Sequence, residues 1–195
     1  MQLIVLRHGP TPWNEAGRLQ GRTDLPLSEG GRCILQNWVV PVQWRAIPCW
    51  ASPLRRALET AEILNLLHPV VTSALIEMDW GSFEGRTLDE LRFELGDALA
   101  VNEARGLDFC PPGGESPRDV MARVRRWIDR LDPATADAIF VTHKGVRRAL
   151  LALATGWDMT GPPPIKLRDH EALRLSRDAF GQLTVIDTVS LAPCL

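Results

Sequence analysis

Short apolar runs recur along the chain and are separated by segments in which apolar residues have helical spacing. The first run, Leu3 to Leu6, is aliphatic and β-branched, which is typical of a fully buried strand. Later runs predict strands over residues 47–51, 70–72 and 138–142. Near the C-terminus, residues 171–176 and 183–189 lie on either side of a turn at Phe180 and Gly181 and predict an antiparallel pair of strands.

Helices are expected between these strands. Apolar residues recur at helical spacing from Ser28 to about Val40, over residues 53–66, from Thr87 to Leu99, from Ser116 to Leu131 and over residues 146–153. Ser28, Thr87 and Ser116 are residue types that favour the N-cap, whereas Gly30 and Gly31 weaken the first helix. This alternation predicts one domain spanning residues 1–195, with a three-layer α/β/α fold, a mostly parallel central sheet and a late antiparallel edge strand.

Two histidines directly follow predicted strands. Arg7 and His8 come at the end of the first strand, and His143 comes after the strand that ends at Thr142. Ligands bind at the carboxyl ends of strands in open α/β sheets, so both histidines can share a pocket if their strands are neighbours. Imidazole acts as base, ligand or nucleophile near neutral pH, and guanidinium binds oxyanions. Arg7 and His8 therefore indicate an anionic substrate, although an ordinary strand-end turn explains an isolated Arg-His-Gly equally well.

A series of motifs resembles, in order, those of the histidine phosphatase superfamily, also called phosphoglycerate mutase-like. The motifs are Arg7-His8-Gly9-Pro10-Thr11-Pro12-Trp13-Asn14, Gln20 to Ser28, Ser52 to Ala57 with Thr60-Ala61, Leu75-Ile76-Glu77 with Trp80-Gly81 and Glu84-Gly85, Pro112 to Ser116, and Val141-Thr142-His143 with Arg148-Ala149-Leu150. They lie within residues 3–150, roughly three quarters of the chain, and their order is more specific than any single motif. The resemblance implies the same fold and points to the phosphatase branch.

The resemblance also implies roles for individual residues. The catalytic residues implied are His8, Glu77, His143, Arg7 and Arg56, and the substrate-binding residues are Asn14, Thr11, Gln20 and Gly21. His8 would attack phosphorus to form a phosphohistidine, and Arg7 and Arg56 would bind the phosphoryl oxygens. His143 would complete the pocket and, if protonated, stabilise the transition state. Glu77 would be the general acid and then the general base, with Asp79 as the alternative.

One departure from the family pattern concerns substrate binding. The family usually has a glycine after the second histidine, whereas here Lys144 stands there before Gly145. Its ammonium group could point at a second anionic group of the substrate, and the alternative is a lysine directed to solvent or to an acidic side chain. Pro10 and the pair Cys33-Ile34 also depart from the pattern, on the substrate side of the site.

Several other residues are expected to be structural. Arg55 is expected at the rim of the site, and His68 and His170 at the surface or in turns, because both histidines lie outside every motif. Most tryptophans are expected in the core, although Trp13 and Trp80 lie within motifs and could touch the substrate. The loop formed by residues 113–116 is expected to cap a helix, to press on the substrate, or to do both.

Composition and charge argue against several classes of partner. The net charge of −2 gives no general attraction for nucleic acid or an anionic membrane surface. No apolar stretch approaches the roughly 18 residues of a membrane span. The cysteines are widely separated, which argues against a zinc site and a disulfide framework; they are Cys33, Cys49, Cys110 and Cys194. We expect no metal, no cofactor and a cytoplasmic location, and the sequence predicts no oligomeric state.

The sequence therefore predicts a metal-independent phosphomonoesterase that acts on a small phosphorylated metabolite. The main alternative is a cofactor-dependent phosphoglycerate mutase, which in the family goes with a longer chain and lid segments. The stretch between Gly85 and Pro112 is short and is expected to hold one helix and a connector. A second alternative is a catalytically idle phosphate-binding protein.

Overall fold

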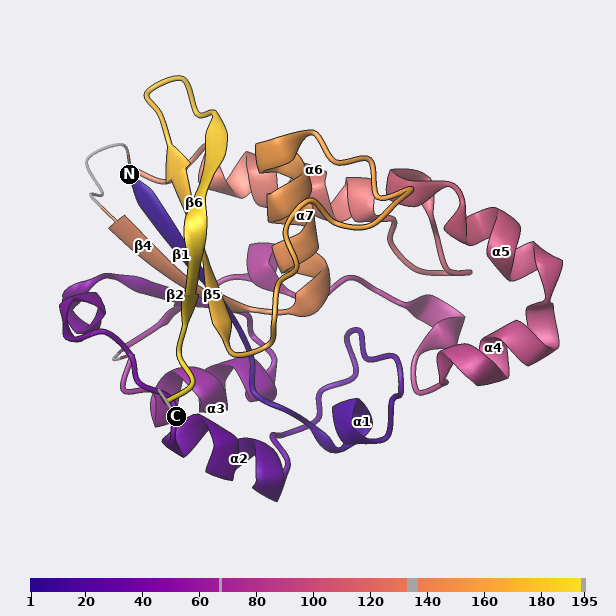
Figure 1. The fold of residues 1–195 in the computed structure, drawn as a ribbon, viewed down its shortest axis with the longest axis horizontal. Helices are drawn as coiled ribbons and strands as arrows, with labels where there is room; N and C mark the ends of the chain where they lie inside the picture. The colour runs from indigo at the N-terminus through magenta and orange to yellow at the C-terminus, as the bar shows by residue number, and fades with distance from the viewer. Residues whose placement is uncertain (67, 133–136, 194–195) are drawn as a thin grey trace.

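The computed structural model describes residues 1–66, 68–132 and 137–193 and contains a six-stranded mixed sheet (Figure 1). The strands are β1 (Gln2–Arg7), β2 (Cys49–Ala51), β3 (Val70–Val71), β4 (Asp137–Thr142), β5 (Glu171–Arg177) and β6 (Leu183–Ser190), in the spatial order β3-β2-β4-β1-β5-β6. The strands β3, β2, β4 and β1 run parallel to one another. Strand β5 pairs antiparallel with β1 and with β6. The predicted sheet, with its late antiparallel edge, is confirmed.

Helices pack on both faces of this sheet (Figure 1). The α-helices are α1 (Pro12–Glu15), α2 (Glu29–Gln36), α3 (Arg55–Ile63), α4 (Leu88–Leu95), α5 (Asp97–Glu103), α6 (Pro117–Ile128) and α7 (Lys144–Thr155). Short 3₁₀ helices cover Val42–Ala46, Ser73–Leu75, Gly81–Phe83 and Gly106–Asp108. Helices α2 and α3 cover one face, and α6 and α7 cover the other, so the three-layer α/β/α prediction is confirmed.

The apolar run in β1 is continuous because both faces of the strand are covered. Leu3 and Val5 pack into the core beneath α6 and α7, whereas Ile4 and Leu6 pack into the core beneath α2 and α3. All four side chains are at most 1 % exposed. A parallel strand that is buried on both faces shows an unbroken apolar sequence rather than an alternating one.

Strands β1 and β4 are neighbours, as the positions of the two histidines predicted. The register pairs Arg7 with Thr142, and the His8 backbone N–H donates to the Thr142 carbonyl at 2.9 Å. His8 and His143 therefore leave the same edge of the sheet side by side, and their ring centroids are 5.0 Å apart.

The first long helix is shorter than predicted. Helix α2 ends at Gln36 rather than near Val40, because the Asn37 side-chain amide donates to the Cys33 carbonyl and caps the last turn. The Val39 N–H then donates to the Leu191 carbonyl, which carries the chain away from the helical path.

The neighbouring elements are also shorter than predicted. Helix α3 ends at Ile63, and Asn65 then adopts a φ of 54°, a left-handed conformation that stops the helix before residue 66. Strand β2 begins only at Cys49, because the Ile47 N–H is used in the preceding 3₁₀ turn and Pro48 has no N–H to donate.

The prediction of a single helix from Thr87 to Leu99 is wrong. Gly96, at φ 48°, separates α4 from α5, and the pair extends away from the sheet (Figure 1). The predicted N-cap is present, because the Thr87 hydroxyl accepts the Glu90 N–H and the Glu90 carboxylate accepts the Thr87 N–H. Leu91 and Leu99 pack with Phe83 in a small cluster separate from both main cores. The stretch between Gly85 and Pro112 thus holds two α-helices and a short 3₁₀ helix rather than one helix and a connector.

The structure also bears on membrane and metal chemistry within the described ranges. No helix there is long and apolar enough to cross a membrane. No group of three or more histidine, cysteine or acidic side chains in those ranges could hold a metal ion. Cys33, Cys49 and Cys110 are free thiols, and Cys194 lies outside the described residues.

Candidate active site

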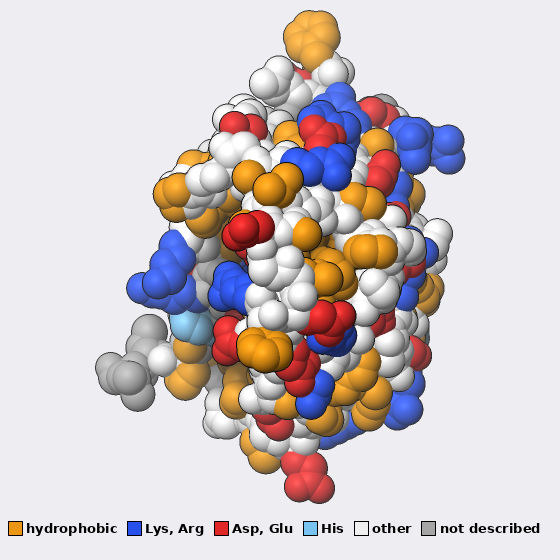
Figure 2. Space-filling model, turned by 90° about the vertical axis from the view of Figure 1, so that its right-hand side faces the viewer, with side chains coloured by type: hydrophobic (Ala, Val, Ile, Leu, Met, Phe, Trp, Pro, Cys, Tyr) orange, Lys and Arg blue, Asp and Glu red, His pale blue; other side chains and the backbone are white. Residues whose placement is uncertain are grey.

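A cavity of about 920 Å³ opens beyond the carboxyl ends of β1 and β4. Six predicted site residues line it: Arg7, His8, Asn14, Gln20, Glu77 and Lys144. The other four, Thr11, Gly21, Arg56 and His143, are buried beside the cavity and are not part of its lining. The opposite wall comes from α4, α5 and nearby aromatic side chains, including Trp80 and Phe109. At the end of the molecule that carries α4 and α5, apolar, basic and acidic side chains are interspersed (Figure 2).

The His8 imidazole is buried and oriented by the backbone. It is 5 % exposed, and its Nδ1 lies 2.6 Å from the Gly9 carbonyl oxygen. Because a carbonyl only accepts, this contact places the proton on Nδ1 and leaves the Nε2 lone pair available. Burial, Arg7 and Arg56 hold the pKa of His8 well below its usual range. His8 is therefore a neutral imidazole at physiological pH.

His143 and Arg56 form a fully buried layer behind His8. The Arg56 Nε–H donates to His143 Nδ1 at 3.2 Å, and His143 Nε2 lies 2.7 Å from the Ser52 hydroxyl. Burial, His8 and the nearby arginines hold the pKa of His143 well below its usual range, so the ring is neutral. Arg56 also donates to the carbonyls of Thr23 and Gly21. Burial lowers the pKa of Arg56 to about 10, which leaves it charged at neutral pH.

Arg7 and Gln20 bring unpaired donors to the cavity. Arg7 forms an ion pair with Asp169, but its buried Nε has no hydrogen-bond partner in the described part of the chain. The Gln20 Nε2 is likewise buried and unpaired there, while its Oε1 accepts the Thr11 hydroxyl at 2.7 Å. Buried donors are rarely left unsatisfied, so these two atoms favour an oxyanion ligand at this wall. Thr11 thus orients Gln20 and also accepts the Asn14 N–H.

Glu77 is a buried carboxyl group at the cavity wall. It is 4 % exposed and accepts N–H bonds from Met78 at 2.7 Å and from Gly145 at 3.1 Å. Burial raises the pKa of Glu77 even though these bonds and the nearby arginines lower it. Asp79, the alternative acid, instead accepts the Gly81 N–H and pairs with Arg22. The geometry therefore favours Glu77 as the proton donor.

We expect Gly145→Ala to lower activity by displacing Glu77. A Cβ at position 145 would lie 2.3 Å from Glu77 Oε1 and 3.2 Å from its Cδ, so the carboxyl group would have to move. Alkyl phosphates should be affected more than p-nitrophenyl phosphate, because only a poor leaving group depends strongly on protonation. Steady-state kinetics on both esters measure this difference.

Gly161→Ala is the matched control, because a Cβ there meets nothing within 4 Å. A Gly145→Ala enzyme that loses the same factor on both esters would show that the glycine does not act through Glu77.

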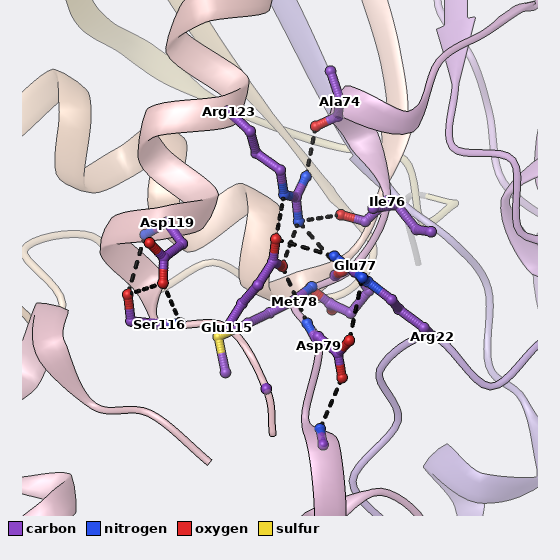
Figure 3. A network of polar contacts seen from close by, with 12 residues as sticks. Arg22, Ala74, Ile76, Glu77, Met78, Asp79, Glu115, Ser116, Asp119 and Arg123 are labelled. Atoms are coloured by element: carbon purple, nitrogen blue, oxygen red, sulfur yellow. Dashed lines mark hydrogen bonds and ion pairs between the residues drawn. The ribbon is translucent and has the colours of Figure 1, made fainter. Parts of the chain in front are cut away.

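Arg123 holds the segment that carries Glu77 (Figure 3). Its guanidinium donates to the carbonyls of Ala74 and Ile76, each at 2.7 Å, and to that of Glu77 at 3.2 Å. It also pairs with Glu115, which forms a second ion pair with Arg22 at 3.0 Å. No sequence signal marked Arg123, because its carbonyl partners lie more than forty residues away in the chain.

Glu84 lies within the predicted Glu84-Gly85 motif, although the sequence predicted no role for it. Its carboxylate accepts the N–H of Arg22 at 2.6 Å, the N–H of Thr23 at 2.9 Å and the Thr23 hydroxyl. These bonds fix the loop whose Gly21 and Thr23 carbonyls bind Arg56. Glu84 therefore supports the buried arginine from a distance.

The structure also shows where the other arginine, histidine and tryptophan residues singled out in the sequence lie. Arg55 is exposed and pairs with Glu59, and His68 is exposed. Neither His68 nor His170 lines the cavity. Trp80 lines it and Trp13 does not.

The loop over residues 113–116 has a clear structural role. The Ser116 hydroxyl accepts the Asp119 N–H and caps α6, as predicted. The Glu115 N–H donates to the Asp79 carbonyl, and the Glu115 carboxylate accepts the Asp79 N–H at 3.2 Å. The loop therefore fixes the extended segment next to Glu77.

Fold and site together define a three-layer α/β/α protein with two neutral, buried histidines and several arginines at one sheet edge. The chain belongs to the histidine phosphatase superfamily, branch 1, whose family model matches residues 3–185. The resemblance seen in the motifs is confirmed.

Two of the relatives are phosphatases by name. An acid phosphatase from Mycobacterium tuberculosis is 32% identical over 162 residues, covering 77% of this chain and 73% of that protein. A probable 2-carboxy-D-arabinitol-1-phosphatase from Arabidopsis thaliana is 29% identical over 163 residues, covering 80% of this chain but only 33% of that protein.

Solved structures of similar proteins agree with this membership. The mycobacterial glucosyl-3-phosphoglycerate phosphatase in complex with VO3 is 27% identical, with a TM-score of 0.81 and coverage of 98% of this chain and 99% of that one. The protein TTHB049 from Thermus thermophilus is 34% identical, with a TM-score of 0.72 and coverage of 99% and 100%. The comparisons support a hydrolase of the histidine phosphatase family.

Proposed function

We propose that this protein is a phosphomonoesterase that hydrolyses a small phosphorylated metabolite through a phosphohistidine on His8. The observation that carries the proposal is the state of His8, a neutral imidazole with its Nδ1 proton held by the Gly9 carbonyl. Its Nε2 lone pair can attack phosphorus without prior loss of a proton. The family membership and the phosphatase relatives support the same reaction.

In the first step, His8 Nε2 attacks phosphorus and the bond from phosphorus to the ester oxygen breaks. Glu77, which burial keeps protonated to higher pH, gives its proton to the leaving oxygen, so an alcohol is released. The positive charge that develops on the imidazole is stabilised by the Gly9 carbonyl, which accepts the Nδ1–H.

In the second step, water attacks the phosphohistidine and the bond from phosphorus to Nε2 breaks. The Glu77 carboxylate formed in the first step takes a proton from this water. Inorganic phosphate leaves, and both His8 and Glu77 return to their starting states.

Positive charge for the phosphoryl oxygens comes from the protein in this mechanism. Arg7 and Gln20 offer unpaired donors, and Asn14 lies in the same wall. Arg56 adds a second guanidinium from behind His8. His143 is neutral, so in this mechanism it holds Arg56 and packs against the His8 ring instead of donating charge. We expect the reaction to need no metal ion.

Hydrolysis is favoured over mutase chemistry by the named phosphatases among the relatives. The decisive experiment is a screen of phosphorylated metabolites in the presence of EDTA, with bisphosphoglycerate-dependent mutase activity measured alongside. The proposal predicts release of inorganic phosphate without mutase activity. Phosphoryl exchange between substrates without net phosphate release would support a mutase, and absence of both would support a phosphate-binding protein.

We expect the activity to be greatest on the acidic side of neutrality. His8 must be neutral, and its lowered pKa preserves that form as the pH falls. Glu77 must be protonated, and its raised pKa keeps the carboxyl group protonated at pH values at which an ordinary carboxyl group is ionised. Activity on alkyl phosphates should therefore fall as the pH rises through the pKa of Glu77, as pH profiles of kcat/KM will show.

The ratio of wild-type to Glu77→Gln activity isolates this effect, because titration of the substrate is common to both enzymes. The ratio should decline with rising pH. A ratio independent of pH would show that another group causes the loss of activity at high pH.

A further inference from the structure

A second, smaller cavity of about 170 Å³ adjoins the candidate active site. Lys144, Arg148 and Asp169 line both cavities, so the two spaces share a wall. The remaining lining of the small cavity is Arg147, Leu151, Pro163, Ile165, Lys166 and Leu167. A space of this volume holds several water molecules or one compact polar group.

Charge in this small cavity is strongly unbalanced. Its described lining has four basic side chains, Lys144, Arg147, Arg148 and Lys166, and one acidic side chain, Asp169. That carboxylate already forms an ion pair with Arg7 in the main cavity. The basic side chains therefore lack a matching anion within the described lining of the cavity.

Arg147 supplies an independent indication of a ligand. The residue is 2 % exposed, and its Nη1 and Nη2 donate to the carbonyls of Arg168 and Glu171. Its Nε is buried and has no hydrogen-bond partner among the residues that the structure describes. An unsatisfied buried donor of a charged group is costly, and an anionic oxygen would satisfy it.

The pKa shifts of the basic residues that line the small cavity also favour an anionic ligand. Burial and then the charge of Arg7 lower the pKa of Arg147, to about 10. Burial and the neighbouring arginines also lower the pKa of Lys144, whereas Asp169 raises it. A bound anion would relieve this repulsion between cations.

We propose that the small cavity binds a second anionic group of the substrate, such as a carboxylate. The substrate class is then a phosphomonoester with a second acidic group, placed so that the ester phosphate lies at His8 while the other group lies beyond Lys144. This inference rests on the proposed phosphatase function, in which the ester phosphate of the substrate binds at His8. The sequence singled out Lys144 alone for this role, and the structure adds Arg147, Arg148 and Lys166 to the same cavity.

The test compares two series of alkyl phosphates of increasing chain length, one ending in a carboxylate and the other in a methyl group. At the length that spans the two cavities, the carboxylate should raise kcat/KM by roughly 10- to 100-fold, the range expected for hydrogen bonds to charged groups. Lys166→Gln should reduce that preference, because this exposed residue lines only the small cavity. Lys144→Gln should reduce it as well.

Arg126→Gln is the matched control, since Arg126 is an exposed residue of α6 that lines neither cavity. It should retain the full preference. Equal kcat/KM for both series at every length would overturn this inference and leave the phosphatase function standing. Failure to hydrolyse either series or any other phosphomonoester would instead overturn the proposed function.

Equilibrium dialysis with inorganic phosphate tests binding without catalysis. We expect two equivalents per chain in the wild type and weaker binding of one equivalent in Lys166→Gln. Two equivalents together with equal hydrolysis of both series would show that the small cavity binds a free anion, and the substrate assignment would be wrong.

Discussion

Replacing His8 by alanine is expected to lower kcat by roughly a thousandfold or more on every phosphomonoester that the wild type hydrolyses. His8 is the only imidazole of the candidate site that lines the cavity in the described structure, because His143 is fully buried behind it. Removing the ring removes the nucleophile, while Arg7 and Gln20 still provide donors for phosphate. Single-turnover and steady-state kinetics should therefore show a loss of chemistry rather than of binding.

His68→Ala is the control for this prediction, because His68 is an exposed histidine outside the cavity. Thermal unfolding should confirm that both variants are folded. A folded His8→Ala enzyme with wild-type turnover would refute the assignment of the nucleophile.

Glu77→Gln is expected to slow alkyl phosphates by roughly 10²- to 10⁴-fold, the usual contribution of a positioned general acid. Met78 and Gly145 donate to different oxygens of the Glu77 carboxyl group, so the glutamine keeps an acceptor for one of these two N–H bonds, and it has no acidic proton to give. p-Nitrophenyl phosphate should be slowed far less, because p-nitrophenolate leaves without protonation. A plot of log kcat against the pKa of the leaving group should therefore become steeper in the variant.

Asp79→Asn separates the two candidate acids. Asp79 accepts the Gly81 N–H and pairs with Arg22, so its loss should alter both classes of substrate to a similar, smaller extent. Equal losses on alkyl and aryl esters in Glu77→Gln would transfer the acid role to Asp79 or Glu84.

The central strands could be predicted from sequence because burial on both faces leaves a continuous apolar run. Leu3 to Leu6 shows this most clearly, and its partner strand β4 has the same pattern. The sequence also predicted that β1 and β4 are neighbours, because His8 and His143 can share a pocket most simply if they lie at the same sheet edge. The first prediction depends on a local pattern that side-chain burial imposes directly, and the second depends on the chemistry that the two histidines would share.

The break at Gly96 could not be predicted in the same way. Leu91, Leu95 and Leu99 keep helical spacing across it, and periodicity reports which side chains face the interior rather than whether the backbone is continuous. A glycine within such a pattern is compatible with either a continuous helix or a left-handed break.

Motifs identified which residues gather at the site, but not which of them reach the cavity. Arg56 and His143 lie behind His8 because their partners, Ser52 and the Gly21 carbonyl, are buried there as well. Contacts between segments far apart in the chain also hid the role of Arg123. These arrangements depend on tertiary packing, which short motifs do not encode.

The most direct test of the account is to trap the covalent intermediate. Wild-type protein mixed with a ³²P-labelled phosphomonoester and quenched in alkaline denaturant should retain label that is stable to alkali and lost in acid, as a phosphoramidate requires. Peptide mapping should place this label on His8, and His8→Ala protein should retain none. Hydrolysis without any labelled protein, or label in an acid-stable ester or on another residue, would contradict the proposed mechanism.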